Sequence, residues 1–330
     1  MQPNINNLAI LRISIHGESQ YAWANAENLS DESPIFQLSP TLQFYRKRLP
    51  SLIEHVTSTK LGTFGEFRDK LSILNPLPSP DKTLCTAFNY SSHLKELGEG
   101  KIRQPLFFSK HPSTLTDPYS PLPLKDEKIL LDYEVELGVV IGSHLKWHQK
   151  LTTQEAEDSI FGYVLVNDIT SRRYLISDNG FIWRGKNLID STPIGPWIIP
   201  VETMKRLTSF VEPATPELRL TSSIERRGPC QNGSTNEMVF TVTEQLNALL
   251  EITPLSPGDL IFTGTPGGTA FHIPRIVRFI GRVTNGRFNH RFLKQQEKSH
   301  RYLKIGDQVT TSAEWLGTQK NQITTGLEVK

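Results

Sequence analysis

Apolar and polar residues alternate along residues 8–24, with the pair His16–Gly17 near the middle. Because successive side chains of a strand point to opposite faces, this alternation predicts two half-buried strands joined by a turn at that pair. Three prolines at alternate positions in residues 75–81 then predict an extended connector, since proline disfavours helix interiors and central strands. We therefore predict a small β-containing N-terminal domain over residues 1–80.

From residue 81 onward, the chain consists of short β-rich apolar runs separated by Gly and Pro turns. Examples are LDYEVELGVVIG (131–142), GYVLVNDIT (162–170) and GDLIFTG (258–264). Helical spacing is rare, and residues 241–250 are one candidate helix. Strands and helices do not alternate regularly, so the pattern favours an α+β fold over a doubly wound one for a second domain spanning residues 81–330.

Composition adds little beyond this, with 37% hydrophobic and 21% charged residues, as in ordinary globular proteins. The formal net charge of +2 gives no general attraction for nucleic acids or membranes, so we expect neither as a partner. Two distant cysteines, a polar N-terminus and the lack of a long apolar stretch predict a cytosolic, that is cytoplasmic, protein.

Candidate chemistry begins with two carboxylates in the run 131–142. Glu134 and Glu136 project to the same side of a strand of period two, and such close like charges need a nearby cation. A hard divalent ion, Lys or Arg would serve, although both Glu could instead face solvent. Asp168 ends the apolar run 161–168, where it is either a third metal ligand or a turn residue.

Five motifs decide between these alternatives because of their order. They read DYEVELGVVIG (132–142), GYVLVND (162–168), GKNLIDSTPIGPW (185–197), LSPGDLIFTGTPGG (255–268), and LKIGDQV (303–309) followed by LGTQKN (316–321). In this order they resemble the fumarylacetoacetate hydrolase family, and the resemblance covers roughly residues 83–325.

The resemblance implies a catalytic domain built as a mixed β-roll or β-sandwich, in a homodimer. It also implies a divalent ion, Mg²⁺ or else Mn²⁺ or Ca²⁺, held by Glu134, Glu136 and Asp168. The implied activity is hydrolysis of a carbon–carbon bond in a small acidic keto acid, such as an acylpyruvate or a fumarylacetoacetate-like diketo acid from aromatic catabolism. A decarboxylase or isomerase acting through a metal-stabilised enolate is the alternative, as is a non-catalytic binding protein.

Further site residues follow from the same family positions. His93 and Glu96 are similar to a His-xx-Glu pair on a short helix, where the carboxylate would orient the imidazole as a base, unless they are an ordinary surface pair. Lysines and hydroxyls at family positions could hold substrate oxygens. The predicted catalytic residues are His93, Glu96, Lys186 and Thr265, and the predicted substrate-binding residues are Lys110 and Arg172.

The chain departs from the family pattern after Asp168. Arg173 stands in place of an acid and Leu175 in place of a glutamine associated with the attacking water, which puts hydrolysis in doubt more than the metal site. Ile189 occupies another acidic position, so the neighbouring Asp190 receives no role.

A basic insertion at residues 271–304 is the other departure, with nine Lys or Arg against one Glu. Residues 273–280 have the apolar spacing of one helical face, and residues 283–288 carry the Asn-Gly of a tight hairpin. We expect a helix and a hairpin that pack beside the active-site mouth or a dimer partner, because the apolar stripe would otherwise be exposed. The alternative is a mobile, solvated loop.

Overall fold

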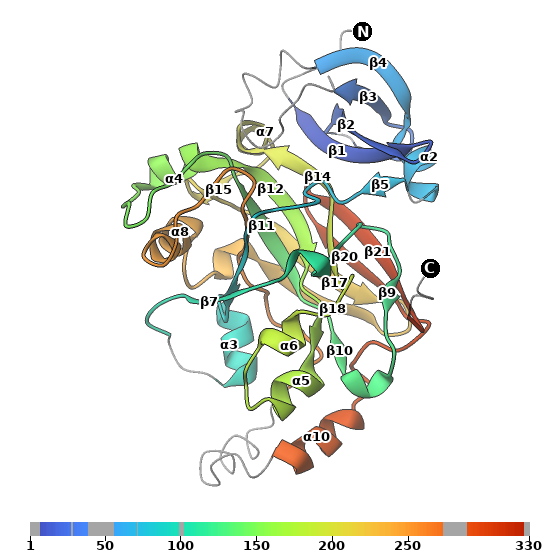
Figure 1. Ribbon diagram of the computed structural model, residues 1–330, viewed down its shortest axis with the longest axis vertical. Helices are drawn as coiled ribbons and strands as arrows, with labels where there is room; N and C mark the ends of the chain where they lie inside the picture. Colours follow the sequence, from blue (N-terminus) through green and yellow to red (C-terminus); the bar gives the residue numbers. More distant parts are fainter. Residues whose placement is uncertain are drawn as a thin grey trace.

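The computed structural model describes residues 7–27, 29–38, 56–70, 72–98, 102–272 and 289–326. Its frame is a large mixed sheet of twelve strands (Figure 1). The main path of this sheet runs in the order β4 (Val56–Thr63), β3 (Pro34–Leu38), β2 (Glu18–Asn25), β1 (Leu8–Ile15), β14 (Thr192–Pro200), β12 (Ile160–Asn167), β11 (Val135–Ile141), β19 (Leu260–Phe262), β6 (Thr83–Ala87) and β7 (Leu106–Ser109). Two short strands, β5 (Ile73–Leu74) and β8 (Leu115–Thr116), pair with β1 and β14.

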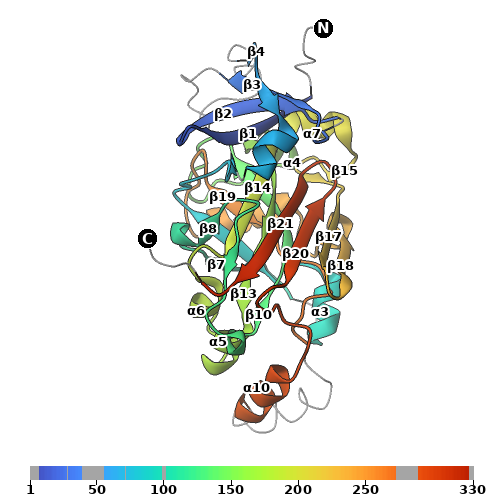
Figure 2. The same cartoon turned by 90° about the vertical axis from the view of Figure 1, so that its right-hand side faces the viewer.

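A second, five-stranded sheet packs against the middle of the large one, and its β20–β21 hairpin faces the viewer in Figure 2. Its order is β18 (Gly228–Ser234), β17 (Arg219–Ile224), β20 (Gln308–Ala313), β21 (Gly317–Thr324) and β9 (Leu122–Pro123). Two further pairs are β10 (Leu131–Asp132) with β13 (Thr170–Ser171), and β15 (Phe210–Glu212) with β16 (Thr215–Pro216). The α+β prediction is confirmed.

The core lies on both faces of β11 and β12, which are buried throughout. Val135 and Leu137 point into the space between the two sheets, where they pack in one cluster with Leu220. Val140 and Val164 face the other side and pack with Phe262. Burial on both faces explains why these runs are almost continuously apolar, and it makes any carboxylate at their ends a buried one.

Helices are short and lie around the sheets. They are α2 (Phe64–Asp69), α3 (Ser91–Leu97), α4 (Thr153–Ser159), α5 (Arg172–Ser177), α6 (Trp183–Lys186), α7 (Val201–Leu207), α8 (Val242–Leu250) and α10 (Asn289–Glu297), with single 3₁₀ turns at Pro112–Thr114, Glu127–Ile129 and Thr235–Glu237. The helix expected over residues 241–250 is confirmed as α8, which Thr241 caps through the backbone N–H of Glu244. Among the described residues, no helix is long and apolar enough to cross a membrane.

The predicted N-terminal strand, turn and strand are confirmed as β1 and β2, which pair in register from Leu8–Asn25 to Ile15–Glu18. His16 and Gly17 both have positive φ in the turn between them. β1 also pairs with β14, so the N-terminal strands extend the large sheet. The division into domains at residue 80 stays a prediction.

The basic insertion is described only in part. The predicted helix over residues 273–280 and the hairpin over residues 283–288 lie outside the described residues. The insertion does contain a helix that the sequence pattern did not indicate, α10. In both views α10 lies at the opposite end of the molecule from β1–β4, close to α5 (Figures 1 and 2).

Candidate active site

Three carboxylates meet where β11 begins and β12 ends. Glu134 directly precedes β11, Glu136 lies within it, and Asp168 directly follows β12. All three are buried, and one carboxylate oxygen from each lies within 4.8 Å of the others. The same-face arrangement expected from the strand period is therefore present, and the cluster could hold a metal ion.

Asn167 fixes the backbone around this cluster. Its side-chain oxygen accepts a hydrogen bond from the Glu134 N–H at 3.0 Å, and its amide group donates to the Thr311 hydroxyl at 3.0 Å. The Asp168 N–H in turn donates to the Glu134 carbonyl at 2.8 Å. The two strand ends are therefore held together at the positions that present the carboxylates, which suits a site that must keep its geometry.

Three side-chain cations surround the carboxylates. Lys110 Nζ lies 2.6 Å from Asp168, whereas Lys186 Nζ lies 2.6 Å from Asp168 and 2.5 Å from Glu134. Arg172 bridges Glu134 and Asp132, with Nε 2.7 Å from Asp132. The cluster thus has the Lys and Arg partners that clustered carboxylates require.

Charge compensation in the cluster is incomplete. Burial would raise the pKa of Glu134, but Lys186 and Arg172 lower it below its ordinary value. Glu136 has no such partner among the described residues beyond the Gly264 N–H at 2.8 Å, and burial together with Asp168 and Glu134 raises its pKa. With Asp132 included, four carboxylates lie among three side-chain cations, so the cluster would carry one net negative charge if all four carboxylates were ionised. A hard divalent cation with oxygen ligands fits this donor set.

Close packing of α5 on α6 positions Lys186. A Cβ atom on Gly185 would lie 2.9 Å from both the Leu175 side chain and the Ser171 carbonyl, so only glycine allows this approach. Lys186 itself is buried, and its Nζ lies 5.2 Å from the centre of the Phe108 ring. The glycine of the GKN sequence therefore serves the placement of the lysine that follows it.

His93 and Glu96 both lie on α3, as expected. Their closest atoms, Nδ1 and Oε2, are 3.8 Å apart, which is beyond hydrogen-bond length. Instead, both Glu96 oxygens accept the Gly268 N–H at 2.9 Å. Burial would raise the pKa of Glu96, but His93, Gly268 and Arg301 lower it. Buried His93 Nδ1 has no hydrogen-bond partner in the described parts of the chain.

Two predicted contacts with substrate stay predictions, because the side chains have other partners here. The Thr265 hydroxyl donates to the Val135 carbonyl at 2.9 Å and accepts from Gln231 at 2.7 Å. Lys110 is buried and also donates to the Lys186 carbonyl. Arg172, Lys186 and Thr265 line a pocket next to the carboxylates, whereas Lys110 is not part of its lining.

Sequence reasoning missed two residues that organise the site. Gln231 accepts the Val135 N–H at 3.0 Å and donates to Thr265 and the Pro266 carbonyl. Asp132 is fully buried, pairs with Arg172, and accepts the N–H groups of Ala270 at 2.7 Å and Phe271 at 3.1 Å. The DYEVE motif contains Asp132, but no spacing rule marks its partners, which are distant in sequence.

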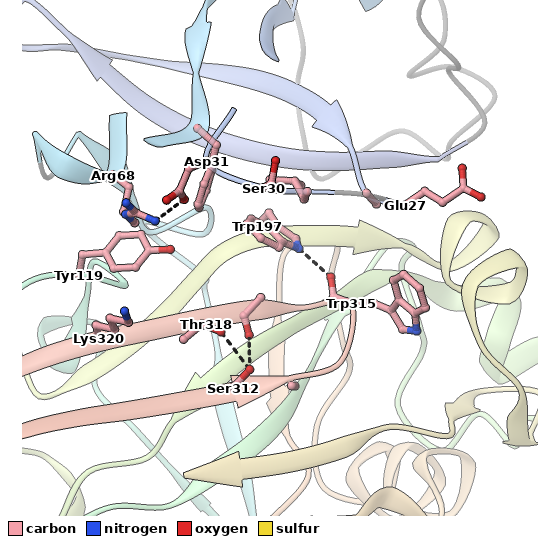
Figure 3. Close-up of a pocket in the computed structure, with 15 residues that line it drawn as sticks. Glu27, Ser30, Asp31, Arg68, Tyr119, Trp197, Ser312, Trp315, Thr318 and Lys320 are labelled. Atoms are coloured by element: carbon pink, nitrogen blue, oxygen red, sulfur yellow. Dashed lines mark hydrogen bonds and ion pairs between the residues drawn. The ribbon is translucent and has the colours of Figure 1, made fainter. Parts of the chain in front are cut away.

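The pocket beside the carboxylates has a volume of about 540 Å³. Glu134, Glu136, Arg172, Lys186, His93 and Thr265 contribute to its lining. A larger cavity of about 790 Å³ lies between the N-terminal strands and the β20–β21 hairpin (Figure 3). None of the predicted site residues lines that cavity, and Arg68 there is paired with Asp31. We therefore place the chemistry in the smaller pocket.

Comparisons with known proteins identify the family of this chain. Residues 82–324 match the family described as fumarylacetoacetate (FAA) hydrolase, C-terminal. The oxaloacetate tautomerase YisK of Bacillus subtilis is 31% identical over 271 residues, covering 80% of this chain and 77% of that protein. The mitochondrial oxaloacetate tautomerase FAHD2A of Bos taurus is 27% identical over 277 residues, covering 83% and 75%.

Solved structures show the same fold. A fumarylacetoacetate hydrolase from Exiguobacterium antarcticum superposes with a TM-score of 0.69 at 24% identity, covering 96% of this chain and 99% of that one. A 2-hydroxyhepta-2,4-diene-1,7-dioate isomerase from Mycobacterium marinum gives 0.67 at 22% identity, covering 96% and 98%. With the family match over most of its length, the chain belongs to the fumarylacetoacetate hydrolase family.

Proposed function

We propose that this protein is a metal-dependent tautomerase or isomerase of small acidic 2-keto acids, acting through an enolate. The observation that carries the proposal is the buried cluster of Glu134, Glu136 and Asp168, in which Lys and Arg side chains pair with Glu134 and Asp168 but none of the described residues forms an ion pair with Glu136. Relatives named as oxaloacetate tautomerases support keto–enol chemistry over the carbon–carbon hydrolysis that the sequence first suggested.

The metal would be held by the three carboxylates, and we propose Mg²⁺, with Mn²⁺ and Ca²⁺ as alternatives, because all three prefer oxygen ligands. When bound, such an ion acts as a Lewis acid that stabilises negative charge on a carbonyl oxygen. It would also change the local charge from one negative to one positive. Arg172 and Lys186, which line the pocket, would then attract the carboxylate of an anionic substrate.

His93 is our candidate for moving the proton. Its ring lines the pocket, while its Nδ1 is buried and lies 3.8 Å from Glu96. We therefore assign the other ring nitrogen, Nε2, to accept a proton from the carbon next to the keto group and to return it.

Leu175 argues against hydrolysis. It lines the pocket at the position where the family pattern has a glutamine associated with the attacking water, and its side chain can neither donate nor accept a hydrogen bond. Cleavage of an acylpyruvate stays the second candidate, since a His93–Glu96 pair is what water activation would use.

A product assay separates the two candidates. The purified protein with Mg²⁺ is mixed with freshly dissolved enol-oxaloacetate and, separately, with acetylpyruvate, and both enol absorbance and the products are followed. The proposal requires accelerated enol decay above a buffer blank with the same Mg²⁺, with no loss of carbon. Cleavage of acetylpyruvate without any effect on enol decay would favour the hydrolase. Homodimer assembly and cytosolic location remain predictions.

A further inference from the structure

We call Glu134, Glu136 and Asp168, with their partners Lys110, Arg172 and Lys186, the charged floor of the active-site pocket. Much of the remaining lining is apolar, and it includes six hydrocarbon side chains without a hydrogen-bonding group: Leu97, Phe107, Leu175, Ile176, Phe271 and Phe292. A polar or charged substrate group placed against them would lose hydrogen bonds to water without replacement. We call these six residues the apolar wall.

The departures of this chain from the family pattern meet in the apolar wall. Leu175 replaces the family glutamine, and Phe271 and Phe292 belong to the basic insertion. The two phenylalanine rings pack edge to face with centroids 5.9 Å apart, and Phe292 is 8% exposed. The replacement at residue 175 and the insertion therefore have one common effect, which is to add apolar side chains to the pocket lining.

Hydrogen bonds and ion pairs connect the apolar wall to the charged floor. Asp132 accepts the Phe271 N–H at 3.1 Å and binds Arg172, whose guanidinium lies 5.2 Å from the centre of the Phe271 ring. A second connection joins α10 to α5 through the Arg173–Glu297 ion pair at 2.6 Å. Arg173 is itself one of the departures. The wall thus has a defined position relative to the carboxylates.

The pocket is larger than a minimal substrate needs. Oxaloacetate has about nine non-hydrogen atoms, which would take at most about 270 Å³ even at the ~30 Å³ that a water molecule occupies in the liquid. The pocket of about 540 Å³ lies in the range of about 300–1,000 Å³ that is usual for larger ligands. A head group bound at the carboxylates would leave the space along the apolar wall unfilled.

We propose that the substrate is a 2-keto acid that carries an aryl or alkyl substituent, and that Leu175, Phe271 and Phe292 select for it. This inference rests on the proposed function for the head group and adds the class of the substituent. Since one methylene in an apolar pocket changes selectivity by about 10–200-fold, a whole apolar substituent should change kcat/KM by at least about tenfold.

The test compares phenylpyruvate with oxaloacetate, using the rate of keto–enol interconversion in the presence of Mg²⁺. In the unchanged protein, kcat/KM should be at least about tenfold higher for phenylpyruvate. Leu175→Gln retains the size of the side chain and adds an amide, and Phe292→Ala removes a ring without touching the Arg172 contact. Each should lower the phenylpyruvate-to-oxaloacetate ratio by about tenfold. Trp147→Ala removes an exposed ring outside the pocket and should leave the ratio unchanged.

Binding measured by calorimetry separates failure of this inference from failure of the proposed function. If phenylpyruvate binds more tightly than oxaloacetate and Leu175→Gln removes the difference, the inference holds even if neither compound is turned over. If oxaloacetate is interconverted while phenylpyruvate neither binds more tightly nor reacts faster, the proposed function holds and the inference is overturned. An unchanged ratio in both pocket variants overturns it as well.

Discussion

The floor and the wall of the active-site pocket differ in their origin as well as in their chemistry. The carboxylates of the floor come from the ends of β11 and β12, two strands buried on both faces, and all ionisable side chains of the floor except Glu136 have ionic partners. The wall comes from the helices α3 and α5, from the edge strand β7 and from the insertion, and it contains no charge. Buried strands hold the groups that must not move, while the additions to the fold determine which substituent fits beside them.

The largest expected effect of a single substitution is on the floor. Glu136→Gln removes the carboxylate that has no side-chain cation. Replacing a residue that only hydrogen-bonds to a metal ligand usually lowers metal affinity or activity by about 10–100-fold. For a direct ligand, we expect both metal affinity and turnover to fall by more than about a hundredfold. Calorimetric Mg²⁺ titration and the enol-decay rate measure the two effects.

The same substitution should not lower the unfolding temperature of the metal-free protein, because it relieves repulsion from Glu134 and Asp168. Asp190→Asn is the matched control, since Asp190 lies outside the cluster. This variant should bind Mg²⁺ and turn over the substrate normally. Full metal affinity in Glu136→Gln would exclude Glu136 as a ligand.

The second prediction concerns a substitution that removes one of the positive charges of the floor. Lys186→Met removes the cation shared by Glu134 and Asp168, while Arg172 and Lys110 still pair with them. We therefore expect the free energy of unfolding without metal to fall by about 3 kcal/mol, the low end of the range for a broken buried ion pair. Urea unfolding provides the measurement.

Lys205→Met is the control for this loss, because it breaks the Lys205–Glu157 pair with a lysine that is 42% exposed. Its cost should stay below about 1 kcal/mol. Equal losses in the two variants would mean that buried Lys186 contributes no more to stability than a partly exposed lysine does. Added Mg²⁺ should stabilise Lys186→Met more than Lys205→Met, because loss of the Lys186 charge leaves the carboxylates with a stronger attraction for the metal.

His93 lines the same pocket, and its ring is stacked at 6.4 Å on that of Phe88, which also lines the pocket. If it moves the proton, His93→Ala should reduce kcat on the order of a hundredfold while leaving Mg²⁺ affinity within about threefold. His93→Asn, closer in size, should be equally inactive. A normal kcat in either variant would remove His93 from the reaction.

The smallest effect concerns the attachment of the wall. Arg173→Ala breaks the ion pair with Glu297, whose partners are about one-third exposed, so stability should fall by less than about 1 kcal/mol. We expect KM for phenylpyruvate to rise a few-fold while KM for oxaloacetate stays the same. Equal changes in both would indicate that α10 affects the whole pocket.

The sequence predicted the meeting of the three carboxylates from one local rule and one resemblance. Period-two alternation places Glu134 and Glu136 on one side of a strand. Asp168 at the end of its apolar run could also have been a turn residue, and the order of the five motifs decided for a metal ligand. The α+β fold and α8 follow from similarly local patterns. Gln231 and Asp132 could not be found this way, because their partners lie up to about 140 residues away and no spacing connects them.

The wall was harder to predict for the same reason. Leu175 was noticed only as a missing amide, and its contact with the pocket depends on how α5 packs on α6. The pattern in the insertion pointed to residues 273–280, whereas the described helix is α10, which packs through Phe292 against Phe271 and pairs through Glu297 with Arg173. His93 and Glu96 do lie together, but at 3.8 Å between Nδ1 and Oε2, and Glu96 accepts its hydrogen bond from the Gly268 N–H, which is distant in sequence.

Deuterium exchange tests most directly whether the floor forms an enolate. The protein is incubated with oxaloacetate in D₂O with Mg²⁺, and the protons on the carbon beside the keto group are followed by NMR against a blank containing Mg²⁺ alone. The account predicts exchange faster than the blank, saturation with Mg²⁺, an intact carbon skeleton, and loss of the effect in Glu136→Gln. Exchange at the rate of the blank, or faster exchange that survives in Glu136→Gln, would contradict it.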